Sequence, residues 1–158
     1  MDERDERFMQ EAIELSRTGM LRGDGGPFGC VIVKDGQVVG RGTNRVTSTN
    51  DPTAHAEITA IRGACAALGS FQLEGCTVYT SCEPCPMCLG ALYWARPARI
   101  VYAATREDAA DAGFDDSFIY EELPLQPTER RYAMEHKLRD HAKRVFEEWK
   151  ALEKKVKY

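Results

Sequence analysis

The chain has 158 residues, of which 43% are hydrophobic and 29% are charged, a length that suits one globular domain with a single core. With 21 Lys and Arg residues against 25 Asp and Glu residues, its formal net charge is −4, which argues against a general nucleic-acid-binding protein. The sequence contains no run of 18 apolar residues, and the charged start Met1–Glu6 lacks the pattern of a signal peptide. We therefore expect a cytoplasmic protein without a membrane span.

The first part of the chain alternates between helical and strand patterns. Apolar residues recur on one face from Arg7 to Thr18, which predicts a helix that ends at Gly19. The apolar run from Phe28 to Lys34 predicts a strand. Asp35-Gly36 is typical of a hairpin turn, so Gln37 to Gly42 is expected to return as the second strand.

The middle of the chain continues this alternation. Arg45 to Asp51 is expected to be a polar loop, and His55 to Leu68 an Ala-rich helix ended by Gly69. The next elements are expected to be a strand, a helix, a strand and a short helix followed by a loop: Cys76–Ser81, Cys85–Ala95, Arg99–Ala104 and Thr105–Asp116. This order predicts an α/β domain whose mixed sheet contains one hairpin and parallel crossovers.

The C-terminal part differs in pattern and in charge. Leu123 to Pro127 contains two prolines and is expected to be a linker, while apolar residues three and four apart from Leu138 to Val156 predict an amphipathic helix. A short edge strand is expected at Tyr132–Met134. Residues 128–158 carry ten basic and six acidic residues, a net +4, against eleven and nineteen before them, a net −8. The helix would pack on its own sheet or on a partner subunit, and the pattern leaves both open.

Two short motifs stand thirty residues apart: His55-Ala56-Glu57 and Pro84-Cys85-Pro86-Met87-Cys88. Each lies at the start of a predicted helix. Cysteines at i and i+3 on a first turn place both sulfurs on one side, and the electropositive helix start lowers thiol pKa values. One histidine and two cysteines leave a fourth position open, which is typical of catalytic zinc.

The motifs therefore predict one Zn²⁺ per chain, held by His55, Cys85 and Cys88, with Glu57 as the catalytic proton carrier. Two alternatives stay open. Cys82 would complete a structural four-ligand site, and Cys85 with Cys88 would form a thioredoxin-like redox pair. The other cysteines lie in apolar runs and are expected to be small core residues: Cys30, Cys65 and Cys76.

The paired motifs match the H-x-E…P-C-x-x-C signature of zinc deaminases. With the segments Tyr79–Ala91, Tyr93–Pro97 and Ala109–Tyr120, nearly the whole chain resembles the cytidine deaminase-like superfamily, and within it the bacterial guanine deaminases. The segment Gly113-Phe114-Asp115-Asp116 favours that branch.

The resemblance implies a three-layer α-β-α sandwich with a five-stranded mixed sheet. It also implies a homodimer in which the C-terminal helix is exchanged between subunits. The chain would then consist of a deaminase core (1–122), a linker (123–127) and a C-terminal arm (128–158), within a single domain overall.

The activity implied by the resemblance is zinc-dependent hydrolysis of guanine, a small purine base, to xanthine and ammonia in purine salvage or catabolism. Guanosine or another aminated heterocycle is an alternative substrate, and tRNA adenosine is less favoured because the body is acidic. The resemblance assigns polar substrate contacts to Asn44, Asp116 and, less firmly, Asp115. It assigns aromatic pocket positions to Phe28 and Trp94. Tyr158 would close an active site, in cis or in the partner.

Overall fold

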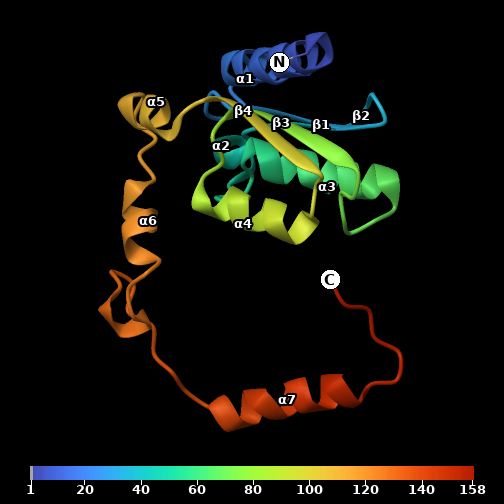
Figure 1. The fold of residues 1–158 in the computed structure, drawn as a ribbon. Helices are drawn as coiled ribbons and strands as arrows, with labels where there is room; N and C mark the ends of the chain where they lie inside the picture. Colours follow the sequence, from blue (N-terminus) through green and yellow to red (C-terminus); the bar gives the residue numbers. More distant parts are fainter. Residues whose placement is uncertain (1) are drawn as a thin grey trace. The chain divides into compact units, whose positions relative to one another are not determined.

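The computed structural model describes residues 2–158. The chain divides into two compact units, and the boundary in the sequence falls between Asp116 and Ser117. In the first unit a sheet lies between helices (Figure 1). The strands are β1 (Gly29–Lys34), β2 (Gln37–Thr43), β3 (Cys76–Cys82) and β4 (Arg99–Ala104). The helices are α1 (Glu3–Arg22), α2 (Val46–Thr49), α3 (Ala56–Leu68), α4 (Pro86–Ala95) and α5 (Arg106–Asp111).

The sheet has the strand order β2-β1-β3-β4. β1 pairs antiparallel with both β2 and β3, and β3 pairs parallel with β4. The α3 and α4 helices cover one face and α1 covers the other (Figure 1). The predicted α/β class, the mixed sheet and the three-layer order are therefore confirmed.

The number of strands was predicted wrongly, because the sheet has four strands rather than five over residues 2–158. No strand forms at Tyr132–Met134. The backbone N–H of Met134 instead donates to the Pro127 carbonyl at 3.1 Å, which folds this segment back on itself. Three alternating residues shortly after two prolines are too weak a signal for an edge strand.

Strand alternation places two apolar clusters on opposite faces of the sheet. Ile32 and Val78 of the sheet and Leu92 of α4 are fully buried in the cluster between the sheet and the helices α3 and α4. Phe8 and Tyr79 pack on the α1 face with ring centroids 5.5 Å apart. Burial of each large apolar side chain contributes roughly 1.5–3 kcal/mol before entropy is counted, so both helical layers hold the sheet in place.

The α1 helix is longer than predicted at both ends. It begins after Asp2, whose carboxylate accepts the Asp5 N–H at 2.8 Å, and it ends at Gly23 in the left-handed region. Gly19 is inside the helix and does not end it. A Cβ at Gly19 would lie 2.8 Å from the Thr43 side chain, so this glycine serves the close approach of α1 to β2. The predicted loop after β2 likewise contains one helical turn, α2.

A buried carboxylate ties α1 to the sheet. Asp5 accepts hydrogen bonds from the Tyr79 hydroxyl at 2.6 Å and from Arg99 Nη1 at 2.8 Å. These donors, Arg99 first, lower the pKa of Asp5 to about 2, while burial and the Asp5 carboxylate raise the pKa of Tyr79 to about 12. The interaction therefore joins α1, β3 and β4 at one point.

This depressed pKa predicts an acid-sensitive contribution to stability. Above pH 4 the ionised Asp5 stabilises the fold fully, and the contribution is lost as pH falls from about 4 towards 2. We expect the Asp5→Asn variant to be less stable at neutral pH and to differ less from wild type at pH 2. Urea unfolding between pH 2 and 7 measures this, with the exposed Glu74→Gln variant as control. A pH-independent difference would contradict the account.

The second unit contains α6 (Ser117–Glu122), the 3₁₀ turn η1 (Pro127–Glu129) and α7 (Arg139–Ala151). The α6 helix was not predicted, and α7 ends at Ala151, so Val156 lies beyond the helix to which its spacing had assigned it. The Arg131 N–H donates to Glu122 at 2.7 Å and holds the turn against α6. Over residues 2–158, no helix is long and apolar enough to cross a membrane.

Candidate active site

Two helices of the first unit present their N-termini with metal-binding side chains. His55 is the N-cap residue of α3 and Cys85 that of α4, both with extended backbone. Pro86 follows at the first helical position, where the absence of an N–H costs nothing. Cys88 lies on the same first turn as Pro86. The local sequence therefore starts each helix so that its donor side chains gather at one point.

The gathered donors fit zinc in chemistry and in spacing. The Cys85 and Cys88 sulfurs lie 3.5 and 3.4 Å from His55 Nδ1, and the three donor atoms all lie within 4.8 Å of one another. Tetrahedral zinc, with bonds of about 2.3 Å to sulfur and about 2.0 Å to nitrogen, places such ligands about 3.5 Å apart. These three residues are the only such group found in residues 2–158.

The surroundings of Cys85 and Cys88 shift the pKa values of the two thiols in opposite directions. Hydrogen bonding from Cys88, followed by His55, lowers the pKa of the Cys85 thiol to about 4, and the same contact raises that of Cys88. The Cys85 sulfur in turn raises the pKa of His55. Cys85 is thus the thiolate of the group, and metal binding would release the remaining protons. Cys82 is outside the group, and its sulfur donates to the Thr105 carbonyl at 3.6 Å.

Glu57 lies on the first turn of α3, two residues after His55. Its side chain is buried, with 6% of the residue exposed. Burial raises the pKa of this carboxyl, and hydrogen bonds from its own backbone, Thr80 and Cys88 partly offset that rise. The Thr80 hydroxyl donates to Glu57 Oε1 at 3.0 Å. A carboxyl with a raised pKa beside a metal-ligand group is suited to accept and return protons.

Asn44 is buried where β2 ends, and its amide orientation is fixed. Its Oδ1 accepts the backbone N–H of Gly26 at 3.3 Å and of Val46 at 3.1 Å. A Cβ at Gly25 would lie 2.3 Å from this oxygen, so only glycine permits the approach. The side-chain NH₂ is therefore the part of Asn44 that can donate to a ligand.

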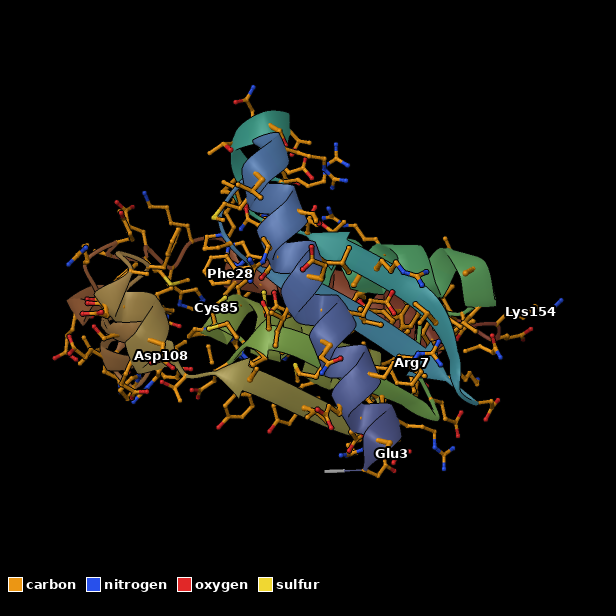
Figure 2. The ribbon with its side chains drawn as sticks, turned by 90° about the horizontal axis from the view of Figure 1, so that it is seen from above. Glu3, Arg7, Phe28, Cys85, Asp108 and Lys154 are labelled. Carbon is orange, nitrogen blue, oxygen red and sulfur yellow. The ribbon has the colours of Figure 1, made fainter. Side chains whose placement is uncertain are left out.

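Three other predicted substrate residues lie outside the helices and strands: Phe28 directly precedes β1, and Asp115 and Asp116 follow α5. Phe28 contacts Phe114 edge-to-face with centroids 5.0 Å apart, and Figure 2 shows Phe28 and Cys85 on the same side of α1. Burial, followed by the Cys85 charge, raises the pKa of the partly exposed Asp116. Asp115 is exposed. The charge of Cys85 thus couples Asp116 electrostatically to the metal-ligand group.

The remaining two predicted substrate residues are both exposed aromatic side chains. Trp94 lies on α4 with 62% of its surface exposed. Tyr158 belongs to the second unit and is also exposed. Sequence reasoning missed Thr80, although a hydroxyl between the apolar strand positions Val78 and Cys82 was a usable signal.

The chain is similar in sequence to known zinc-binding deaminases. Residues 2–104 match the family described as the cytidine and deoxycytidylate deaminase zinc-binding region. The chain is 61% identical over 126 residues to a guanine deaminase of Bacillus subtilis, covering 80% of each protein.

The chain is also similar to a solved structure over its whole length and to a tRNA-specific enzyme over part of its length. An X-ray structure of guanine deaminase from Bacillus subtilis superposes with a TM-score of 0.94 at 52% identity, covering 100% of this chain and 99% of that one. A tRNA-specific adenosine deaminase of Agrobacterium fabrum is 46% identical over 97 residues, covering 61% of this chain and 63% of its own length.

Proposed function

Because this chain belongs to the cytidine and deoxycytidylate deaminase family of zinc-dependent enzymes, we propose that it hydrolyses guanine to xanthine and ammonia. The observation that carries the proposal is the buried Glu57 beside the His55, Cys85 and Cys88 group. The likeness to guanine deaminase covers 80% of the chain in sequence and all of it in structure.

Zinc is the cofactor, and we assign His55, Cys85 and Cys88 as its ligands, one ion per chain. When bound, the metal supplies Lewis-acid activation of water by lowering the pKa of that water to about 7. A three-residue ligand set leaves room for this role, whereas a structural site would require a fourth protein ligand. The position of Cys82 supports the three-ligand assignment, because its thiol is outside the donor group and donates a hydrogen bond to the Thr105 carbonyl.

Glu57 carries the protons of the reaction. In hydrolysis, a water oxygen adds to C2 of guanine and the bond from C2 to the exocyclic amine breaks. Glu57 accepts a proton from the water and gives it to the ring nitrogen beside C2. It then takes the remaining proton from the hydroxyl that has added to C2 and passes it to the amine, which leaves as ammonia while C2 becomes the carbonyl carbon of xanthine. A buried carboxyl of raised pKa is suited to both transfers.

The polar residues around the group would select the base. Guanine presents N–H donors and the acceptors O6 and N7. Because Asn44 directs Oδ1 at backbone donors, its NH₂ would donate to an acceptor of guanine. The Asp116 carboxylate, with Asp115 as the second candidate, would accept ring N–H groups. Phe28 and Trp94 would contact the faces of the ring.

Asn44→Asp is expected to lower kcat/KM for guanine by about 10- to 100-fold, mainly through KM. Aspartate keeps an oxygen for the Gly26 and Val46 N–H groups but replaces the donor with a charge facing a guanine acceptor. Steady-state kinetics measures this. The control Asn50→Asp makes the same change at an exposed position after α2. An unchanged KM in Asn44→Asp would remove Asn44 from the binding site.

We further propose that the protein is a homodimer that exchanges its C-terminal arm, residues 128–158. No residue of α7 is buried, although Val145, Phe146 and Trp149 are apolar and exposed. The first unit also exposes apolar side chains, including Tyr93, Ile100 and Tyr102. Apolar surfaces of this kind mark interaction sites. The arm carries +4 and the body −8, so opposite charges would guide the docking of a second copy.

Mixing two inactive chains tests whether Tyr158 acts across the dimer. One chain carries Glu57→Ala, and the other ends at Lys157 and so lacks Tyr158. If the arm is exchanged, co-refolded mixed dimers contain one complete site, and about a quarter of wild-type activity per chain returns. Each chain refolded alone is the control. No gain on mixing would show that Tyr158 acts in cis, and full activity without Tyr158 would exclude its role.

Guanosine, another aminated heterocycle and tRNA adenosine remain the alternative substrates. An ammonia-release screen distinguishes them by comparing guanine, guanosine, adenine, cytosine, cytidine and a tRNA anticodon stem. We expect guanine to give the highest kcat/KM, and turnover of tRNA without guanine would overturn the proposal. We propose the cytoplasm as the site of the reaction because all six cysteines are free thiols.

A further inference from the structure

Thr80 places a buried hydroxyl on an otherwise apolar face of β3. It is 2% exposed, and it lies opposite Cys30 of β1 in the antiparallel register. Cys30 and Val78, two residues before Thr80, belong to the core cluster beneath α3 and α4. Valine has the same shape and strand preference without a polar group to desolvate. A threonine at this position therefore calls for a hydrogen-bond partner.

The partner of this hydroxyl is Glu57, 23 residues earlier in the chain. Thr80 Oγ1 donates to Glu57 Oε1 at 3.0 Å, and both side chains are buried. A hydrogen bond to a carboxylate is charge-assisted and stronger than one between neutral groups. Because threonine is β-branched, its χ1 angle is stiff, so the sheet fixes the direction of the donor.

We propose that Thr80 is a positioning residue that fixes the orientation of the Glu57 carboxylate, an inference that rests on the proton-carrying role proposed for Glu57. The terminal torsion of glutamate is broad and selects no orientation by itself. Donation to Oε1 holds that oxygen against β3 and leaves Oε2 as the oxygen that exchanges protons with water and guanine.

The other side-chain contact of Glu57 does not replace this role. Cys88 also hydrogen-bonds to Glu57 through its thiol. A cysteine that binds zinc does so as a thiolate and has no proton to donate. In the zinc-loaded enzyme, the Thr80 hydroxyl therefore remains as a side-chain donor to Glu57.

Two substitutions at Thr80 separate positioning from packing. Thr80→Val removes only the donor, and we expect kcat for guanine to fall about 10- to 100-fold with KM within about threefold and zinc content unchanged. Thr80→Ser keeps the hydroxyl and should stay within about threefold of wild-type kcat. Thr77→Val, the same change at the other end of β3, is the matched control. Equal losses in Thr80→Val and Thr80→Ser, or no loss in Thr80→Val, would overturn the inference.

A thermal double-mutant cycle tests the same contact without turnover. With Glu57 present, Thr80→Val leaves a buried carboxylate without its donor and should lower Tm by about 2–4 °C. In the Glu57→Ala background the same change removes an unpaired hydroxyl, so Tm should stay level or rise. Equal Tm losses in both backgrounds would refute the contact. If the wild type failed to turn over guanine, the proposed function would fall while this cycle still reported on Thr80.

Discussion

Replacing Glu57 with glutamine is expected to lower kcat for guanine by at least about 10²-fold while the protein keeps one zinc ion per chain. Glutamine has nearly the shape of glutamate and can still accept the Thr80 hydroxyl, but it cannot take up or return a proton. The loss should therefore appear in kcat, with little change in fold or metal content. Steady-state kinetics and elemental analysis for zinc measure the two quantities.

The exposed Glu74→Gln variant is the control for this experiment, since it makes the same chemical change away from the metal-ligand group. It should keep wild-type kcat. A Glu57→Gln enzyme of unreduced kcat would show that another group moves the protons. Loss of zinc from Glu57→Gln would instead indicate that Glu57 supports the metal site.

Removing zinc is expected to lower activity by at least about 10³-fold, and one equivalent of Zn²⁺ should restore it. The reason is that hydrolysis needs a water molecule whose pKa is lowered by the metal, and the protein without zinc lacks this activation. Cys88→Ala should also lose the metal, because it removes one of the three donor atoms that lie within 4.8 Å of one another. Dialysis against a chelator, followed by zinc titration, measures the first effect.

Cys82→Ala is the matched control for the zinc experiment. Its sulfur bonds to the Thr105 carbonyl and is outside the donor group, so this variant should keep both zinc and activity. Zinc loss in Cys82→Ala equal to that in Cys88→Ala would favour the four-ligand structural site. Full activity of the zinc-free protein would contradict the enzyme proposed here.

The metal-ligand group could be predicted from the sequence because its geometry is local. Cys85 and Cys88 lie at the start of one helix, and His55 and Glu57 lie at the start of another. The spacing within each motif therefore predicts that both of its side chains lie at the same helix N-terminus. The hairpin of β1 and β2 could also be predicted, because Asp35-Gly36 forms the turn that brings the two flanking strands together.

The features that sequence reasoning missed depend on contacts between distant segments. The Thr80 hydroxyl donates a hydrogen bond to Glu57, which lies 23 residues earlier in the chain. The Gly26 N–H donates to the side chain of Asn44, which lies 18 residues later. Gly19 looked like a helix end because its close approach to Thr43 is a property of packing. In the second unit, the predicted strand after the prolines did not form, because a strand needs a neighbour and alternation alone does not supply one.

The stoichiometry of guanine hydrolysis by the zinc-loaded wild-type protein tests the central claim most directly. Xanthine formation is followed by ultraviolet absorbance, and ammonia is measured in the same samples. We expect one xanthine and one ammonia for each guanine consumed, with turnover that disappears in Glu57→Gln. Absence of xanthine from a protein that contains one zinc ion per chain would contradict the proposed activity.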